Sequence, residues 1–99
     1  MTELIRDVTD LPVGTRIPTH DEKIGALTVL ETFDDYENGR LIAVEVDVTC
    51  DRNADIWDMQ VLAKAVGATD ASWLANTPQR RYRLYFDPKA EVTTIDEEG

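Results

Sequence analysis

Residues 24–50 read IGALTVLETF-DDYENG-RLIAVEVDVTC, two β-rich runs on either side of a polar turn. Asn38-Gly39 is the favoured pair for a two-residue type I′ turn, because both residues tolerate positive φ. We therefore predict a hairpin in which Glu37 faces Arg40, and this turn fixes every other cross-strand pair. One face is predicted to join the core, with Ile42 and the pairs Leu27–Cys50, Val29–Val48, Glu31–Val46 and Phe33–Val44. The opposite face is predicted to be wet and acidic, with Thr28, Thr32, Asp34, Glu45, Asp47 and Thr49.

A helix is predicted after the hairpin, over about residues 54–66. Asn53 or Asp51 can cap its first amides, Asp55 and Asp58 favour the positive end of its dipole, and Gly67 supplies a left-handed stop. Its apolar arc should face the sheet and consists of Ile56, Met59, Leu62, Ala63 and Val66. Trp57 lies nearly opposite that arc, beside Val61.

The remaining segments complete a predicted α+β fold. The N-terminal segment to about Pro12 indicates one or two helical turns, and residues 16–20 form a short extended piece. A short helix is predicted over residues 71–75, with Trp73 as a satellite core contact. Residues 80–86 alternate and predict a third long strand, with Tyr82, Leu84 and Phe86 inward. We therefore expect a small antiparallel sheet of three to five strands, built on the hairpin at about 24–50, with the helix at about 54–66 packed on one face.

The length allows one domain, which we place at residues 1–88. Residues 89–99 are predicted to be an acidic, partly flexible C-terminal tail, with a short pairing segment considered at Val92–Ile95. The single cysteine, Cys50, cannot form an internal disulfide, and the N-terminus resembles no secretory signal. We therefore expect a cytoplasmic protein.

The 99 residues include 20 Asp and Glu against 10 Lys and Arg, a formal charge of −10. Such a field repels phosphates, which argues against direct binding of nucleic acid or an anionic membrane and favours a protein partner with a basic surface. Most of the surplus lies in residues 1–60. The candidate partner-binding residues are Asp34, Asp35, Glu37, Glu45, Asp47, Trp57 and Val61. The alternative is a solvated face whose acidity reflects a GC-rich or salt-adapted source.

Residues 80–86 form the one basic cluster of the sequence. Arg81, Arg83 and Tyr85 interleave charge and aromatic rings, a pattern that can hold single-stranded nucleic acid. The cluster is nevertheless an island in an acidic chain. The alternative is that Arg81 and Arg83 neutralise Glu45 and Asp47 across neighbouring strands.

Catalytic chemistry has little support in the sequence. Glu31, on the predicted apolar face, is either an acid with a raised pKa or part of an exposed or bulged strand. His20-Asp21-Glu22 has no second histidine to complete a zinc site, and no glycine-rich phosphate loop is present. We therefore expect no enzyme activity, no cofactor and no metal. The alternative is a small ligand-binding or catalytic domain around Glu31, His20 and Tyr85.

The sequence thus favours a small acidic, non-enzymatic binding protein, either an inhibitor or an accessory subunit. It would dock on a larger basic or nucleic-acid-handling protein, with carboxylates in place of phosphates. A homodimer through the Trp57 face, with a solvated acidic face that keeps it soluble, is the structural alternative.

Overall fold

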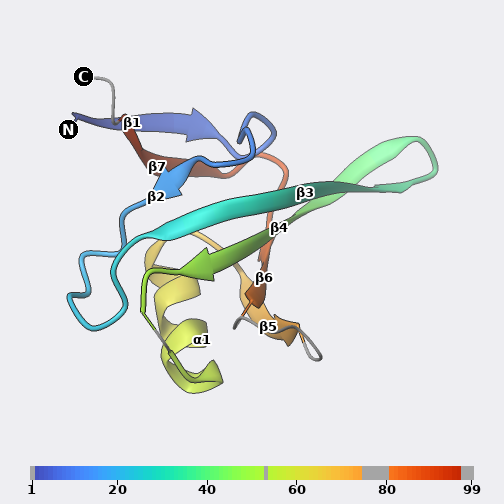
Figure 1. Cartoon of the computed structure of the whole chain (residues 1–99). Helices are drawn as coiled ribbons and strands as arrows, with labels where there is room; N and C mark the ends of the chain where they lie inside the picture. The colour runs from blue at the N-terminus through green and yellow to red at the C-terminus, as the bar shows by residue number, and fades with distance from the viewer. Residues whose placement is uncertain (1, 53, 75–80, 97–99) are drawn as a thin grey trace.

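The computed structural model describes residues 2–52, 54–74 and 81–96. One antiparallel sheet dominates it, in the order β1-β7-β2-β3-β4-β6-β5 (Figure 1). The strands are β1 (Thr2–Asp7), β2 (Arg16–Ile17), β3 (Leu27–Glu37), β4 (Arg40–Cys50), β5 (Asp70–Leu74), β6 (Arg81–Phe86) and β7 (Glu91–Asp96), and the helix is α1 (Ile56–Ala65). The predicted α+β class with three to five strands is therefore wrong, because the described part of the chain is mostly sheet, with seven strands and a single short helix.

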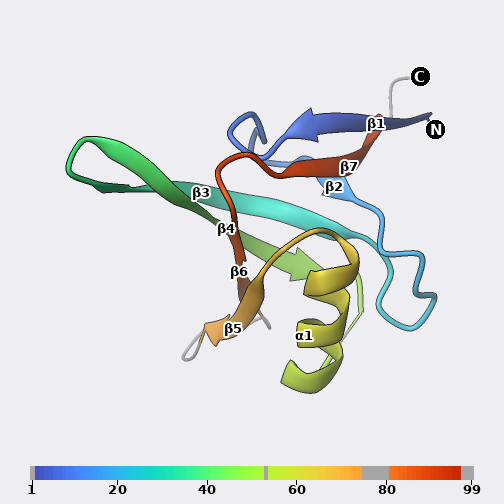
Figure 2. The same ribbon diagram turned by 180° about the vertical axis from the view of Figure 1, so that it is seen from behind.

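The core lies between the sheet and α1, which stands at the β5 end of the sheet (Figure 2). The predicted apolar arc of the helix is confirmed: Met59, Leu62 and Ala63 are buried, and Ile56 and Val66 pack against the core. From the sheet the core receives Ile17, Leu27, Val29, Val44, Val46, Val48, Tyr82, Leu84, Phe86 and Val92. We call the sheet face that carries these residues the core face, and the opposite face the outer face.

The helix ends as predicted but begins differently. Gly67 has a φ of +98°, the left-handed conformation expected of the stop. The N-cap is Asp55, whose carboxylate accepts the N–H of Asp58 at 2.8 Å. Asp51 instead accepts bonds from Arg16 and from the backbone of Ala26, because it lies beside β2 and the segment before β3. Asn53, the other predicted cap, lies outside the described residues.

The hairpin turn is confirmed, but the register between the two strands is only partly as predicted. Asn38 and Gly39 both have positive φ, and Glu37 faces Arg40. The pairs Val29–Val48 and Leu27–Cys50 also form. Between Val29 and Glu31 the register slips by one residue, and it slips back between Asp35 and Tyr36. Two β-bulges thus leave both ends of the hairpin in the predicted register and shift its middle.

The shifted middle reverses which side chains face the core. Phe33 pairs with Glu45 and Glu31 pairs with Asp47, so both lie on the outer face rather than on the predicted apolar face. Thr32 and Asp34 move the other way, opposite Val46 and Val44. Because the side chains of a strand alternate, one extra residue is enough to exchange the two sets. Ile42, also predicted for the core, is exposed at the second bulge.

Two predicted helical segments are strands. Residues 2–7 form β1, which pairs with β7, and residues 70–74 form the edge strand β5, which pairs with β6. Trp73 consequently lies on a strand and is exposed instead of making a satellite core contact. The predicted strand at residues 80–86 is present as β6 from Arg81, with Arg80 outside the described residues. Tyr82, Leu84 and Phe86 point inward as predicted.

The C-terminal segment takes part in the sheet. β7 occupies the place of the pairing segment considered at Val92–Ile95 and pairs with both β1 and β2. A turn from Asp87 to Ala90 leads from β6 into β7, and Ala90 accepts the N–H of Val8 at 3.0 Å. Among the described residues, no helix is long and apolar enough to span a bilayer.

Candidate functional site

The outer part of the hairpin projects from the body as a two-stranded ribbon (Figure 1). β2 pairs with β3 only at Leu27 and Thr28, and β6 pairs with β4 only from Val44 onward. Val29 of β3 also bonds to Gly14 and Thr15, so β3 and β4 pair only with each other between Asp35 and Ala43. We call residues 31–45 the acidic arm. An isolated two-stranded ribbon is only marginally stable in water, so the arm depends on its attachment to the sheet.

The acidic arm concentrates carboxylates on the outer face. The register places four of them together there, which we call the acidic strip: Glu31, Asp35, Glu37 and Glu45. Arg40, opposite Glu37, is the one basic residue within the arm. Asp34, a predicted partner-binding residue, lies on the other face of the ribbon, opposite Val44. The sequence thus located these carboxylates on the hairpin, whereas the bulge decides which of them share a face.

Asp47, the next outward-facing residue after Glu45 on β4, is neutralised within the protein. Arg83 of β6 donates from Nε to Oδ1 at 2.7 Å and from Nη2 to Oδ2 at 3.1 Å. Asp47 is only 8% exposed, so it offers little to a partner. The guanidinium of Arg83 also lies over the ring of Phe33, 4.9 Å from its centroid.

Glu45 shows that the remaining strip keeps a surplus of negative charge. Burial raises the pKa of Glu45, and a hydrogen bond and the charge of neighbouring Asp35 raise it further. The charge of Arg83 lowers the pKa of Glu45, but burial and Asp35 outweigh it, so the net shift is upward. Neighbouring carboxylates raise one another's pKa because their negative charges repel. A bound cation relieves this repulsion, so its binding is favourable. The strip is therefore suited to bind a positively charged surface.

The other basic and aromatic residues of β6 face the same side of the sheet. Arg81 lies opposite Thr49, and the hydroxyl of Tyr85 is 3.0 Å from that of Ser72 on β5. This region does not form a separate basic surface, since Arg83 is committed to Asp47 and Tyr85 lies opposite Glu45. The cross-strand neutralisation considered from the sequence is thus present for Arg83 and Asp47.

Trp57 and Val61 point outward from α1, with 75% and 73% of their surface exposed. They are remote from the acidic strip in the fold, because α1 covers the core face. Trp57 instead shares a surface hollow with Trp73 of β5. Sequence reasoning missed Trp73 as an exposed residue because it assigned residues 71–75 to a helix. The alternation of Ala71 and Trp73 was the signal for a strand.

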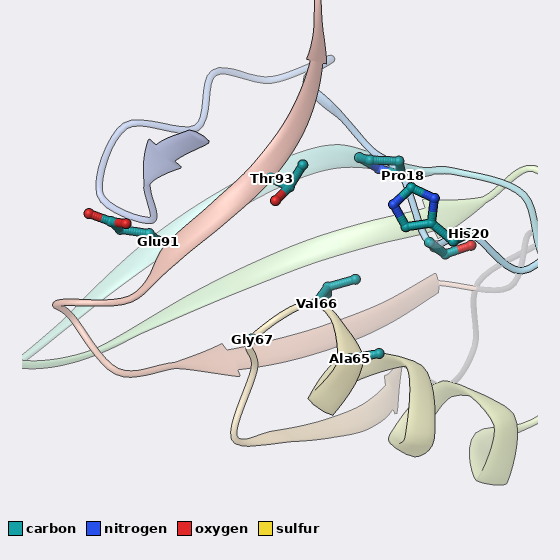
Figure 3. Close-up of a pocket in the computed structure, with 8 residues that line it drawn as sticks. Pro18, His20, Ala65, Val66, Gly67, Glu91 and Thr93 are labelled. Carbon is teal, nitrogen blue, oxygen red and sulfur yellow. The ribbon is translucent and has the colours of Figure 1, made fainter. Parts of the chain in front are cut away.

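A groove of about 500 Å³ lies between the end of α1, β7 and the loop after β2 (Figure 3). His20 and Pro18 line one side, Gly67 lies across from them, and Glu91 and Thr93 come from β7. The backbone of His20 has a φ of +59°, and its Nε2 is 3.6 Å from a carboxylate oxygen of Glu3.

The trio Glu31, His20 and Tyr85 is not assembled in this groove. His20 lines it, but Glu31 and Tyr85 stand on the outer face of the sheet, on strands flanking β4. Within residues 2–52, 54–74 and 81–96, no three His, Cys, Asp or Glu side chains lie close enough to hold a metal ion. No protein-family model, curated protein sequence or solved structure matches this chain. A functional assignment therefore rests on the geometry of the chain itself.

Proposed function

We propose that this chain is a non-enzymatic binding protein, an inhibitor or accessory subunit, that docks through its acidic strip on a basic surface of a larger protein. The observation that carries the proposal is the placement of four carboxylates on one face of the hairpin, with Asp35 and Glu37 on its projecting part and Glu31 and Glu45 at its base. Arg83, whose charge acts on Glu45 from the body of the protein, is bonded to Asp47.

The proposed partner has a nucleic-acid-binding groove. Carboxylates two residues apart on a strand, such as Asp35 and Glu37, have backbone positions about 6.6–6.8 Å apart, so they present a regular line of negative charge. A groove that attracts phosphates through Lys and Arg would be steered toward the same line. The narrow ribbon supplies the strip on an element that can enter such a groove.

The test compares two variants with equal loss of charge. Asp35→Asn/Glu37→Gln/Glu45→Gln removes three of the four carboxylates of the strip, and Asp7→Asn/Glu22→Gln/Glu91→Gln removes three exposed carboxylates elsewhere. Each protein is immobilised and used to capture partners from the cells of origin. We expect the same partner with wild type and with the second variant, and its loss with the first or in about 0.5 M salt. Equal capture by all three proteins, or none by wild type, would contradict the proposal.

Competition tests the nature of the partner surface. Duplex DNA or RNA added to the purified complex should displace the chain in proportion to its affinity for the partner. If the captured protein instead binds nucleic acid and this chain at the same time, the groove is the wrong docking site, although the strip still binds a basic surface.

A further inference from the structure

An aromatic hollow of about 290 Å³ is lined by residues from the start of α1, the end of β5 and β6. Figure 2 shows the ribbons of α1 and β5 next to each other at one end of the sheet. Its described lining residues are Ala54, Asp55, Ile56, Trp57, Trp73 and Tyr82. Both tryptophans are largely exposed, Trp57 by 75% and Trp73 by 58%. The two tryptophans of the chain lie on different elements but line the same hollow. They therefore form one exposed aromatic cluster and are not singly scattered surface residues.

The base of the hollow is held in place by the fold. Tyr82 and Ala54 are buried, and the hydroxyl of Tyr82 donates a hydrogen bond to the carbonyl oxygen of Ala54. This bond joins β6 to the segment that leads into α1. Trp73 lies opposite Tyr82 in the β5–β6 register, so its backbone position is fixed as well. The hollow is therefore a preformed site, and an occupant would not have to order it.

Charge decides which occupant suits this hollow. Asp55 is the one charged residue in its described lining. Asp55 and Asp58 both lie at the first turn of α1, where they offset the positive end of the helix dipole. The chain carries a formal charge of −10, so a second copy would be repelled as the two approach. An anion is disfavoured for the same reason, whereas a cation is attracted.

We propose that this hollow binds an arginine side chain of a partner protein. The guanidinium would stack on the indole rings of Trp57 and Trp73, with the Asp55 carboxylate as its counter-ion. Tryptophan gives the strongest cation–π contact, and exposed tryptophan is enriched at binding hot spots. Arginine suits the site better than lysine, because its planar group stacks on aromatic faces and is more weakly hydrated. The site is independent of the acidic strip.

The test uses the two indole N–H signals in the NMR spectrum of the full chain. The probes are acetyl-Gly-Arg-Gly-amide and the same peptide with citrulline, which has nearly the shape of arginine but no charge. We expect the arginine peptide to shift both signals along a saturating curve. The citrulline peptide should bind at least about fivefold more weakly.

Variants then locate the site. Trp57→Ala and Trp73→Ala should each abolish saturable binding, and their exposure makes both substitutions compatible with folding. Asp55→Asn should weaken the arginine peptide about threefold, because asparagine is an equally good N-cap but has no charge. Val13→Ala removes an exposed apolar residue outside the hollow and should leave the affinity unchanged.

Three results with the peptides would overturn the proposal. They are no saturable shift with the arginine peptide, equal affinity for the citrulline peptide, and equal affinity of wild type and Trp73→Ala. A shift of the indole signals with protein concentration alone would show that a second copy occupies the hollow, which would also overturn it. A normal dispersion of backbone amide signals in each variant confirms that it is folded.

Discussion

Arg83 bonds to both carboxylate oxygens of Asp47, at 2.7 and 3.1 Å, and at the same time covers the ring of Phe33. The three residues come from β6, β4 and β3, so one guanidinium ties together the three strands at the base of the acidic arm. The hydrogen bond to Asp47, together with the negative charge of that carboxylate, raises the pKa of Arg83, although burial acts against that rise. Arg83 therefore has a structural role and is not a free basic residue for a ligand.

Substitution of Arg83 should destabilise the protein. Arg83→Gln leaves a nearly buried carboxylate without its cation, so we expect the free energy of unfolding to fall by about 2–3 kcal/mol. Arg83→Lys keeps the charge but cannot make the two-pronged contact, and about 1 kcal/mol should be lost. Urea denaturation measures both values. Equal stability of Arg83→Gln and wild type would contradict this role.

Glu45→Gln should stabilise the protein at neutral pH. The raised pKa of Glu45 means that the folded chain binds this proton more tightly than the unfolded chain. The corresponding stability is complete below the ordinary glutamate pKa of about 4.3 and is lost as the pH rises through the higher folded value. We expect the variant to exceed wild type in Tm by about 1–3 °C at neutral pH and to match it near pH 4.

Thermal denaturation over this pH range checks the sign. Asp35→Asn should have a similar effect, because Asp35 supplies both the hydrogen bond and the repulsion that raise the pKa of Glu45. A Glu45→Gln protein that is less stable than wild type at neutral pH would show that Glu45 is paired with a cation.

The hairpin was predictable in part, because some of its features depend only on neighbouring residues. Alternation and the Asn38-Gly39 turn were sufficient to locate the hairpin, because both are properties of neighbouring residues. These two signals could not predict the bulge after Val29. The only sequence feature that indicated it was Glu31 on a predicted apolar face, because a bulge returns that carboxylate to water.

The predicted number of strands was too low for a related reason. β1, β5 and β7 are edge or near-edge strands of five or six residues, and their own sequences carry weak patterns. Asp70 and Ala71 favoured a helix on local propensity, yet residues 70–74 form a strand because they pair with β6. Tertiary hydrogen bonds outweighed local propensity there. The aromatic hollow could not be predicted from the sequence, because it needs Trp73 on a strand opposite Tyr82.

Asp51→Asn should weaken the junction between β2, β3 and β4. Asp51 accepts from Arg16 at 2.6 Å and from the Ala26 N–H at 3.1 Å. The hydrogen bond from Arg16, with that from Ala26 and the charges of Arg16 and Arg52, lowers the pKa of Asp51 against the effect of burial. The folded chain thus releases this proton more easily, so the stabilisation is present above the ordinary aspartate pKa of about 3.9 and is lost as the pH falls through the lower folded value.

At neutral pH we expect Asp51→Asn to reduce the free energy of unfolding by about 1–2 kcal/mol. The matched substitution Asp55→Asn retains an N-cap and should cost little. Gly25→Ala tests the same junction from the other side, because a Cβ there would lie 2.7 Å from that of Asp51 and the φ of +80° favours glycine. The role of Asp51 would be refuted if Asp51→Asn and Asp55→Asn unfolded at the same urea concentration.

Cys50 should react slowly with alkylating reagents in the folded protein. It is half-buried at the end of β4, opposite Leu27, and burial together with the charge of Asp51 raises the pKa of its thiol to about 11. Only the thiolate is nucleophilic, and at pH 8 its fraction is roughly 200-fold lower than for a thiol of ordinary pKa near 8.5. Alkylation by iodoacetamide, followed by mass spectrometry, should therefore be roughly 100-fold slower in buffer than in urea. Asp51→Asn removes the nearby negative charge and should accelerate the reaction about twofold. A native rate equal to that in urea would show that the thiol is neither buried nor influenced by Asp51.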